Sequence, residues 1–395
     1  MGDEEDQLQR DRGSPNGRKV GLRDRIKHFT WANFTCTQST GGIAILLSQL
    51  PHQFSGQQTV GTVIFVFNLV VFVILCAAMI TRFALHPQTM KRSVINTPES
   101  FFMGSFWVSC ATIVICMQRF AVPHAGPWVV VAVRVLFWMY AAMTLLYTCV
   151  MFVVSFSQMP VQPDTLSPGV FLKVYNTMLS GTVASAISQS QPPNHRLPII
   201  VAGIAYQGLG LLGSIVLLAW FIGGLFRYGL GAPNQRPGLF MPVGAPGYSI
   251  LTFMGCAMNL PVEHSYFTRY PNAVEILQVL ALWVSIFLWL FGFWLFAMAL
   301  VANLPNVFPK VGGGRGIKPR MAFTLSWWAL VFPNIGFVIG TGFIGQVLES
   351  DGIQWVATAM GILLFVVWLM DLVLHVKAMV AGQVMWPGKD EDASK

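Results

Sequence analysis

The sequence predicts an all-α, polytopic membrane protein, and three observations support this fold class. Of the 395 residues, 54% are hydrophobic and only 10% are charged, whereas a soluble domain carries roughly 25% charged residues. Apolar stretches of more than about 18 residues, each long enough to cross a bilayer as a helix, recur along the whole chain. Polar residues are concentrated in every second stretch, which indicates two structural classes of helix.

Apolar stretches bounded by charged or Pro/Gly-rich breaks predict ten transmembrane spans. The first 29 residues hold no apolar segment of the signal-peptide type, so we expect a disordered tail at 1–29, one ten-helix membrane domain at 30–380 and a short tail at 381–395. The spans cover about residues 30–50, 60–81, 98–119, 128–154, 168–190, 197–226, 239–260, 274–301, 321–346 and 353–380.

The distribution of basic residues predicts the topology. An even number of spans places both termini on one side of the membrane. With the termini inside, the inner segments hold 19 of the 24 Lys and Arg residues, the outer loops hold three, and Arg134 and Lys173 lie within spans. Because cytoplasmic loops are enriched in Lys and Arg, we expect both termini to be cytoplasmic.

The alternation of polar residues predicts how the helices are arranged. Gly, Pro, small polar and charged residues make up roughly 44% of the odd spans and 19% of the even spans, and polar groups in hydrocarbon need internal partners. The odd spans begin at residues 30, 98, 168, 239 and 321, which indicates five repeated helical hairpins. We therefore expect the odd helices to form an inner pore ring and the even helices an outer ring. The alternative is a solid bundle in which small residues merely permit close packing.

The same composition excludes several function classes. The net charge is +8, but the basic residues lie between apolar segments, where an anionic leaflet attracts them, so we expect a bilayer partner and no nucleic-acid partner. All six cysteines fall within predicted spans without CxxC spacing, so we expect neither disulfides nor a metal site. No HExxH or comparable catalytic set is present, so we expect neither an enzyme nor a bound cofactor.

Several short motifs occur along the chain. They are Phe29–Thr30–Trp31, Ser39–Thr40–Gly41–Gly42–Ile43–Ala44, Pro123–His124–Ala125–Gly126–Pro127–Trp128, Ser180–Gly181–Thr182–Val183–Ala184–Ser185, Ser190–Gln191–Pro192–Pro193 and Trp327–Trp328–Ala329–Leu330–Val331–Phe332–Pro333. These motifs resemble those of the tellurite-resistance/dicarboxylate transporter family, and in particular its fungal malic acid transport proteins. The family also contains fungal sulfite exporters and, more remotely, plant slow anion channels. The resemblance spans about residues 29–380.

This resemblance implies a five-hairpin barrel that transports four-carbon dicarboxylates, malate first and then succinate- or fumarate-like acids, across the plasma membrane. It also implies a homo-oligomer, with a trimer expected and a dimer as the alternative. A sulfite or other small-anion exporter on the same fold is the alternative function. By the same resemblance Phe332 is the gate candidate, because remote relatives place a phenylalanine of the ninth helix across the pore. An aromatic ring at a constriction makes a dewetted barrier, whereas the alternative role for Phe332 is packing.

A dicarboxylate needs hydrogen-bond donors and positive potential in place of its hydration shell. Three cations lie in or beside the spans: Lys173, Arg134 and Arg82. Arg134 can instead extend to the interface, Arg82 can simply end its span, and Lys173 is absent from the family pattern. Each hydroxyl or amide can likewise be a helix-packing group. The neutral candidates on the odd helices are Gln38, Ser39, Thr40, Thr177, Ser180, Thr182, Ser185, Asn334 and Thr341.

Two ionisable residues lie one helical turn apart near the inner end of the last span. Asp371 and His375 are spaced i,i+4 and therefore share one face of a helix. An interfacial hydrogen-bonded pair is the favoured interpretation, and a proton relay is the alternative.

Overall fold

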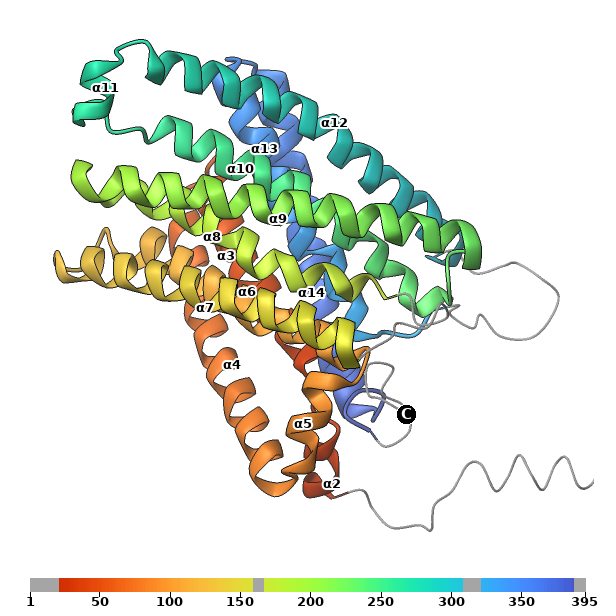
Figure 1. Cartoon of the computed structure of the whole chain (residues 1–395). Helices are drawn as coiled ribbons and strands as arrows, with labels where there is room; N and C mark the ends of the chain where they lie inside the picture. Colours follow the sequence, from red (N-terminus) through yellow and green to blue (C-terminus); the bar gives the residue numbers. More distant parts are fainter. Residues whose placement is uncertain (1–20, 159–166, 308–320, 387–395) are drawn as a thin grey trace, which may run out of the picture.

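The computed structural model describes residues 21–158, 167–307 and 321–386, and over these residues the protein is helical, without β-strands (Figure 1). Part of the predicted N-terminal tail, residues 1–20, and most of the C-terminal tail, residues 387–395, lie outside the described residues. Leu22–Lys27, inside the range predicted as tail, forms helix α2. The longer helices are α3 (Phe34–Gln49), α4 (Gln57–Leu85), α6 (Glu99–Cys116), α7 (Trp128–Gln158), α8 (Leu172–Ile187), α9 (Pro193–Tyr228), α10 (Gly244–Met258), α12 (Ala273–Val307), α13 (Phe332–Val347) and α14 (Asp351–Val380).

Eight helical segments of the described chain are long and apolar enough to cross a membrane. The other two predicted spans correspond to α3 and α8, which have only 16 residues each. Short 3₁₀ segments extend both helices: Trp31–Asn33 (η1) precedes α3, and Pro168–Phe171 (η4) and Ser188–Ser190 (η5) flank α8. The presence of apolar spans is thereby confirmed, and the number ten stays a prediction.

Proline and glycine divide two of the predicted spans into a 3₁₀ segment and an α-helix. Pro233–Val243 (η6) precedes α10, and Leu325–Leu330 (η7) precedes α13. Pro237 and Pro242 lie within η6, where their missing N–H groups prevent regular α-helical hydrogen bonding. Pro333 occupies the first turn of α13, a position that tolerates proline because the N–H there has no partner within the helix. Both α-helices therefore begin inside the predicted spans.

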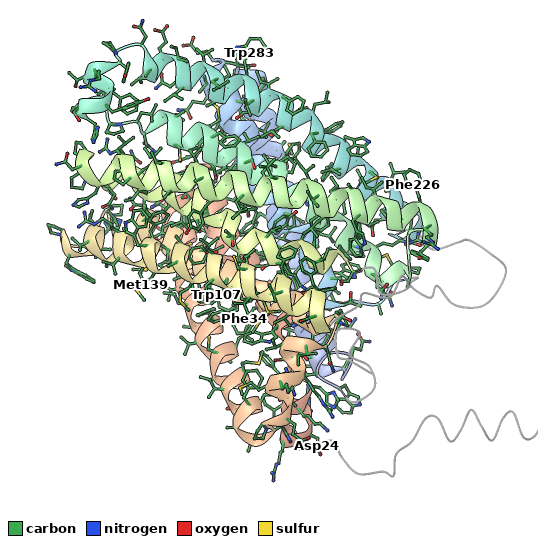
Figure 2. The ribbon with its side chains drawn as sticks, viewed as in Figure 1. Asp24, Phe34, Trp107, Met139, Phe226 and Trp283 are labelled. Carbon is green, nitrogen blue, oxygen red and sulfur yellow. The ribbon has the colours of Figure 1, made fainter. Side chains whose placement is uncertain are left out.

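The helices fall into a buried and an outward-facing class. In the most apolar part of α4, α7, α9, α12 and α14 only 22–33% of residues are buried, whereas the figure is 67–94% for the segments that contain α6, α10 and α13. All 16 residues of α8 and nearly all of α3 are buried. Figure 2 shows Met139 on α7, Phe226 on α9 and Trp283 on α12 at the periphery of the molecule, where they are 58%, 90% and 66% exposed. The polar-rich helices are thus inside, as the alternation predicts.

Contacts among the five buried helices run in a circle. Helix α3 contacts α6, α6 contacts α8, α8 contacts α10, α10 contacts α13, and α13 returns to α3. On the outside, α4 packs on α3, α7 and α9 on α8, α12 on α10, and α14 on α13. Helices α10 and α13 cross at glycines: a Cβ built on Gly247 would lie 2.6 Å from the backbone nitrogen of Phe337, and one on Gly336 would lie 2.8 Å from the nitrogen of Tyr248. Small residues therefore set the closest approach in the ring.

Three short helices complete the described chain: α2, α5 (Gln88–Ile95) and α11 (Ser265–Arg269). Helix α2 links the two ends of the described chain. The guanidinium of Arg25 donates to the carbonyl of Met379 over 2.7 Å and lies 5.6 Å from the ring of Trp386. The first and last described segments therefore lie at the same end of the molecule.

Candidate functional site

A narrow cavity lies among the five buried helices and holds about 20 Å³ of room for water. Each helix of the circle contributes to its wall, and the η2 turn (Met117–Ala121) at the end of α6 does so as well. The lining residues are Ile45 and Gln49 of α3, Ala111, Thr112, Ile115 and Arg119 of α6 and η2, Leu179, Thr182, Ser185 and Ala186 of α8, Tyr248 and Leu251 of α10, and Phe332, Ile335 and Ile339 of α13.

Helical periodicity explains which side chains reach the cavity. On α6 and η2 the lining positions include Thr112, Ile115 and Arg119, spaced i, i+3 and i+7, so they share one helix face. On α13 the positions 332, 335 and 339 follow the same rule. At a rise of 1.5 Å per residue, seven residues correspond to about 10 Å of cavity length.

Two aromatic rings close one end of the cavity. Phe332, the first residue of α13, stacks on Tyr248 of α10 with ring centroids 5.0 Å apart and an interplanar angle of 26°. The hydroxyl of Tyr248 donates to the carbonyl of Phe332 over 3.0 Å. Phe332 is 3% exposed, and a Cβ on Gly42 of α3 would lie 3.3 Å from its ring. The ring is thus held between three helices of the circle.

The opposite end of the cavity carries a positive charge. Gln49 and Arg119 line the cavity near the C-terminal ends of α3 and α6. Residues 117–121 form a π-helical turn, a local irregularity that is frequent at functional sites. The Nε atom of Arg119 is buried without a hydrogen-bond partner among the described residues, and the ion pairs found there involve other residues. The guanidinium is therefore available to an anion.

The cavity contains three of the site residues predicted from the sequence: Phe332, Thr182 and Ser185. Thr182 lies 3.3 Å from the hydroxyl of Thr252, and Ser185 donates to the carbonyl of Leu251 over 3.3 Å. Both hydroxyls therefore sit where α8 meets α10, on the wall of the cavity.

Other predicted hydroxyls and amides contact neighbouring helices. Thr40 accepts a 3.1 Å hydrogen bond from the indole of Trp368 on α14, and Ser39 donates to the carbonyl of Trp328 over 3.4 Å. Thr177 donates to Thr144 of α7, and Thr341 accepts from Trp289 of α12. The remaining three, Gln38, Ser180 and Asn334, each keep one buried side-chain atom without a partner among the described residues; Asn334 also donates to the carbonyl of Leu330 over 2.8 Å.

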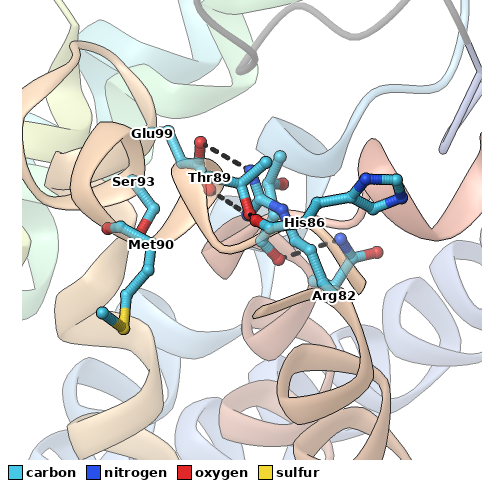
Figure 3. A network of polar contacts seen from close by, with 8 residues as sticks. Arg82, His86, Thr89, Met90, Ser93 and Glu99 are labelled. Carbon is cyan, nitrogen blue, oxygen red and sulfur yellow. Dashed lines mark hydrogen bonds and ion pairs between the residues drawn. The ribbon is translucent and has the colours of Figure 1, made fainter. Parts of the chain in front are cut away.

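The predicted cations lie outside the cavity wall. Lys173 is buried on α8, where its ammonium donates to Ser155 of α7 and lies 4.5 Å from the ring of Phe101. Arg134 is half-buried on α7. Arg82 at the end of α4 is ion-paired with Glu99 at the start of α6, and Figure 3 shows their two dashed contacts beside the helix that carries Met90. This buried ion pair joins α4 to α6.

Sequence reasoning missed Gln49, Thr112, Arg119 and Tyr248 as lining residues. Arg119, the last residue of the span predicted at 98–119, is one of the three basic residues predicted to lie in the outer loops. Its spacing of seven residues from Thr112 was the available signal, since that spacing places both on one helix face. No comparable pattern marks Tyr248, whose position depends on where η6 ends and α10 begins.

Asp371 and His375 share the inward face of α14, and both are buried. The hydrogen bond expected between them is not found, since neither carboxylate oxygen of Asp371 nor Nε2 of His375 has a partner among the described residues. Within the same part of the chain, no three His, Cys, Asp or Glu side chains are placed to hold a metal ion.

Comparisons with known proteins identify the family of the chain. The family model described as voltage-dependent anion channel, SLAC1, matches residues 28–376. The malic acid transport protein of Schizosaccharomyces pombe is 31% identical over 95% of this chain and 84% of its own length. A putative malic acid transport protein of the same yeast is 30% identical over 95% and 85%, and a sulfite efflux pump of Arthroderma otae is 26% identical over 91% and 94%. The chain therefore belongs to the voltage-dependent anion channel (SLAC1) family, the tellurite-resistance/dicarboxylate transporters that its motifs resemble.

Proposed function

We propose that this protein transports four-carbon dicarboxylates, malate first and then succinate- or fumarate-like acids, across the plasma membrane along the axis of its five buried helices. The observation that carries the proposal is the cavity itself, because every helix of the circle lines it, an arginine stands at one end and an aromatic pair closes the other. We further propose ten spans in five hairpins, cytoplasmic termini and one path per protomer of a homotrimer. Membership of an anion channel family supports this reading.

The cavity wall matches the chemistry of a carboxylate. Arg119 can donate two parallel hydrogen bonds to one carboxylate, and such bonds between ions are among the strongest in proteins. The wall also carries the amide of Gln49 and the hydroxyls of Thr112, Thr182 and Ser185, and such neutral groups replace water without adding a second buried charge. The hydroxyls of Thr112 and Ser185, which donate to backbone carbonyls here, would have to turn to donate to an anion. The unpartnered polar atoms of the ring offer further sites for water along the axis.

The small volume of the cavity supports a closed state of the proposed path. Room for water of about 20 Å³ is little more than one water molecule needs, so a four-carbon acid does not fit until side chains move. Phe332 and Tyr248 are the groups that must separate, because they form the end wall. An uncoupled dianion would then be driven outward by an inside-negative potential, by about 4.6 kcal/mol per 100 mV.

Flux in proteoliposomes tests the proposal. Purified protein would be reconstituted with an imposed potential, and uptake of labelled malate would be compared with that of labelled sulfite. We expect saturable malate flux that Arg119→Gln lowers by about tenfold or more, since an Arg–carboxylate contact is worth about 1.5–3 kcal/mol. Arg134→Gln is the matched control: the same charge is removed outside the cavity wall, and the loss should be smaller.

A sulfite exporter is the second candidate function. Two observations favour it: sulfite efflux pumps are similar to this chain over 91% of its length, and the cavity is narrow. Sulfite flux that exceeds malate flux at equal concentration and potential would select this function and reject the dicarboxylate proposal. If Arg119→Gln changed neither the malate flux nor the sulfite flux, the proposed path along the cavity would be contradicted.

A further inference from the structure

Asp371 and His375 are two buried ionisable residues on the outer helix α14. Asp371 is 0% and His375 is 5% exposed. They lie about one helical turn apart, 5 to 9 residues before Val380 at the end of α14, which places them about 8–14 Å from that end. Ionisable residues within membrane spans are costly and mark functional positions by default.

Among the residues that the structure describes, no ion pair is found for the carboxylate of Asp371. Both oxygens of Asp371 and Nε2 of His375 are without hydrogen-bond partners among the described residues. The imidazole instead stacks on the ring of Phe323, 5.6 Å away at 25°, and meets Trp328 edge-on at 5.9 Å. A charged carboxylate in such apolar surroundings is strongly disfavoured. The packed arrangement therefore requires that the pair holds a proton.

The groups that face the pair come from α3, η7 and α13, which pack against α14, and from Phe323 just before η7. Helix α3 contributes one titratable group, the thiol of Cys36, which lies close enough to Asp371 to sense its charge. Neither η7 nor α13 contains a titratable or charged residue. Two charged residues of the described chain lie near the end of α14: Arg25, which donates to the carbonyl of Met379, and Lys377 on the exposed side of the helix.

The same face of α14 contacts η7, the segment that leads to Phe332. Trp328, the neighbour of His375, belongs to η7 and lies four residues before Phe332. The carbonyl of Trp328 accepts from Ser39 of α3, while Trp368, three residues before Asp371, donates to Thr40 of α3. A charge that appears on the pair thus acts on η7 and α3 together, and through η7 on Phe332.

We propose that Asp371 and His375 form a proton-binding site that controls the position of Phe332, so that loss of the proton favours the open path. When Asp371 gives up its proton to water, a lone carboxylate is left among the rings of Phe323 and Trp328, and α14 must separate from η7 to admit water to it. This loosens η7 and frees Phe332 from Tyr248. The inference rests on the proposed function and adds a proton as its regulator.

Anion flux against pH tests the site in the full-length protein. The probe is nitrate, whose charge does not change with pH, and the pH on the side of the C-terminal end of α14 is raised from about 5 to 8. We expect wild-type flux to rise at least about fivefold, the lower range of coupling between two sites. Asp371→Asn keeps the shape of the side chain but cannot lose a proton, so its flux should stay at the low, pH-independent level.

Two further variants make the test specific. Asp351→Asn is the matched control, because it is the same exchange at the exposed start of α14, and its pH profile should equal that of wild type. His375→Gln removes the second proton acceptor, and we expect it to displace the midpoint of the profile by about one pH unit or more. A wild-type profile in both Asp371→Asn and His375→Gln would overturn the proposal.

An infrared measurement separates this proposal from the transport function. A buried protonated carboxyl group has a carbonyl absorption that disappears when it ionises, and we expect this band in wild type and Asp351→Asn but not in Asp371→Asn. Malate flux without pH dependence would leave the transport function standing and overturn the coupling. Absence of both malate and nitrate flux with the infrared band present would overturn the transport function and retain the proton site.

Discussion

Replacement of Phe332 by alanine is expected to raise anion flux, because the ring closes one end of the cavity without donating a hydrogen bond. Phe332 lines the cavity, is 3% exposed and stacks on Tyr248 at 5.0 Å. Its removal opens the aromatic constriction, while the backbone carbonyl that receives the Tyr248 hydroxyl remains in place. An apolar constriction blocks ions by excluding water, so a shorter side chain should let water and anions pass.

The stacking geometry sets the minimum size of the effect. An aromatic pair contributes about 0.5–1.5 kcal/mol beyond its buried area, which corresponds to about a 2- to 13-fold change in the balance between closed and open states. The widened end wall adds to this factor. The same exchange costs stability, because Phe→Ala in a packed core loses about 3–5 kcal/mol. Flux must therefore be normalised to folded, inserted protein.

The assay is malate efflux from proteoliposomes at fixed potential. The flux is corrected for the amount of folded protein, which is taken from the size-exclusion profile. Phe337→Ala is the matched control: Phe337 is a buried phenylalanine of the same helix, but it packs against Trp289 and Phe296 and is not part of the cavity wall. We expect flux to rise in Phe332→Ala only. If Phe332→Ala lowers flux, or if both variants change it equally, Phe332 is a packing residue and the gate lies elsewhere.

Gly247→Ala should lower the free energy of unfolding of the detergent-solubilised protein by about 1–3 kcal/mol, because the added Cβ would lie 2.6 Å from the backbone of α13. A Cβ added at Gly208 meets nothing within 4 Å, so Gly208→Ala should leave that free energy unchanged. Glu99→Gln should lower the free energy of unfolding by about 3–5 kcal/mol, because it leaves the charge of Arg82 buried without its ion-pair partner. Replacement of both residues by methionine should restore most of this stability in the same melting assay, and an equal loss of stability in the double variant would refute the reasoning. Lys173→Gln should raise the half-saturating malate concentration in the flux assay without abolishing transport, because the ammonium adds positive potential from outside the cavity wall. Loss of all transport in this variant would make Lys173 an essential ligand instead.

The sequence alone determined which helices are buried and which face lipid. This succeeded because burial of a helix depends on its own amino-acid composition, which can be read directly from the sequence. Polar groups in hydrocarbon need internal partners, so the helices rich in polar residues lie inside: α3, α6, α8, α10 and α13. The start of α7, which follows Pro127, and both ends of α14 were also predicted to within two residues. The candidate gate Phe332 came from a motif and lies in the cavity wall.

Only the tertiary structure decided which polar side chains reach the cavity. A buried helix has partners on every side, so its hydroxyls divide between the axis and the neighbouring helices, and composition does not distinguish the two: Thr182 lines the cavity, while Thr177, on the same helix, bonds to α7. The π-helical turn that brings Arg119 to the wall and the breaks before α10 and α13 depend on local backbone geometry. The pairing of Arg82 with Glu99 likewise follows from how helices distant in sequence pack together. The same packing leaves the carboxylate of Asp371 without a hydrogen-bond partner among the described residues.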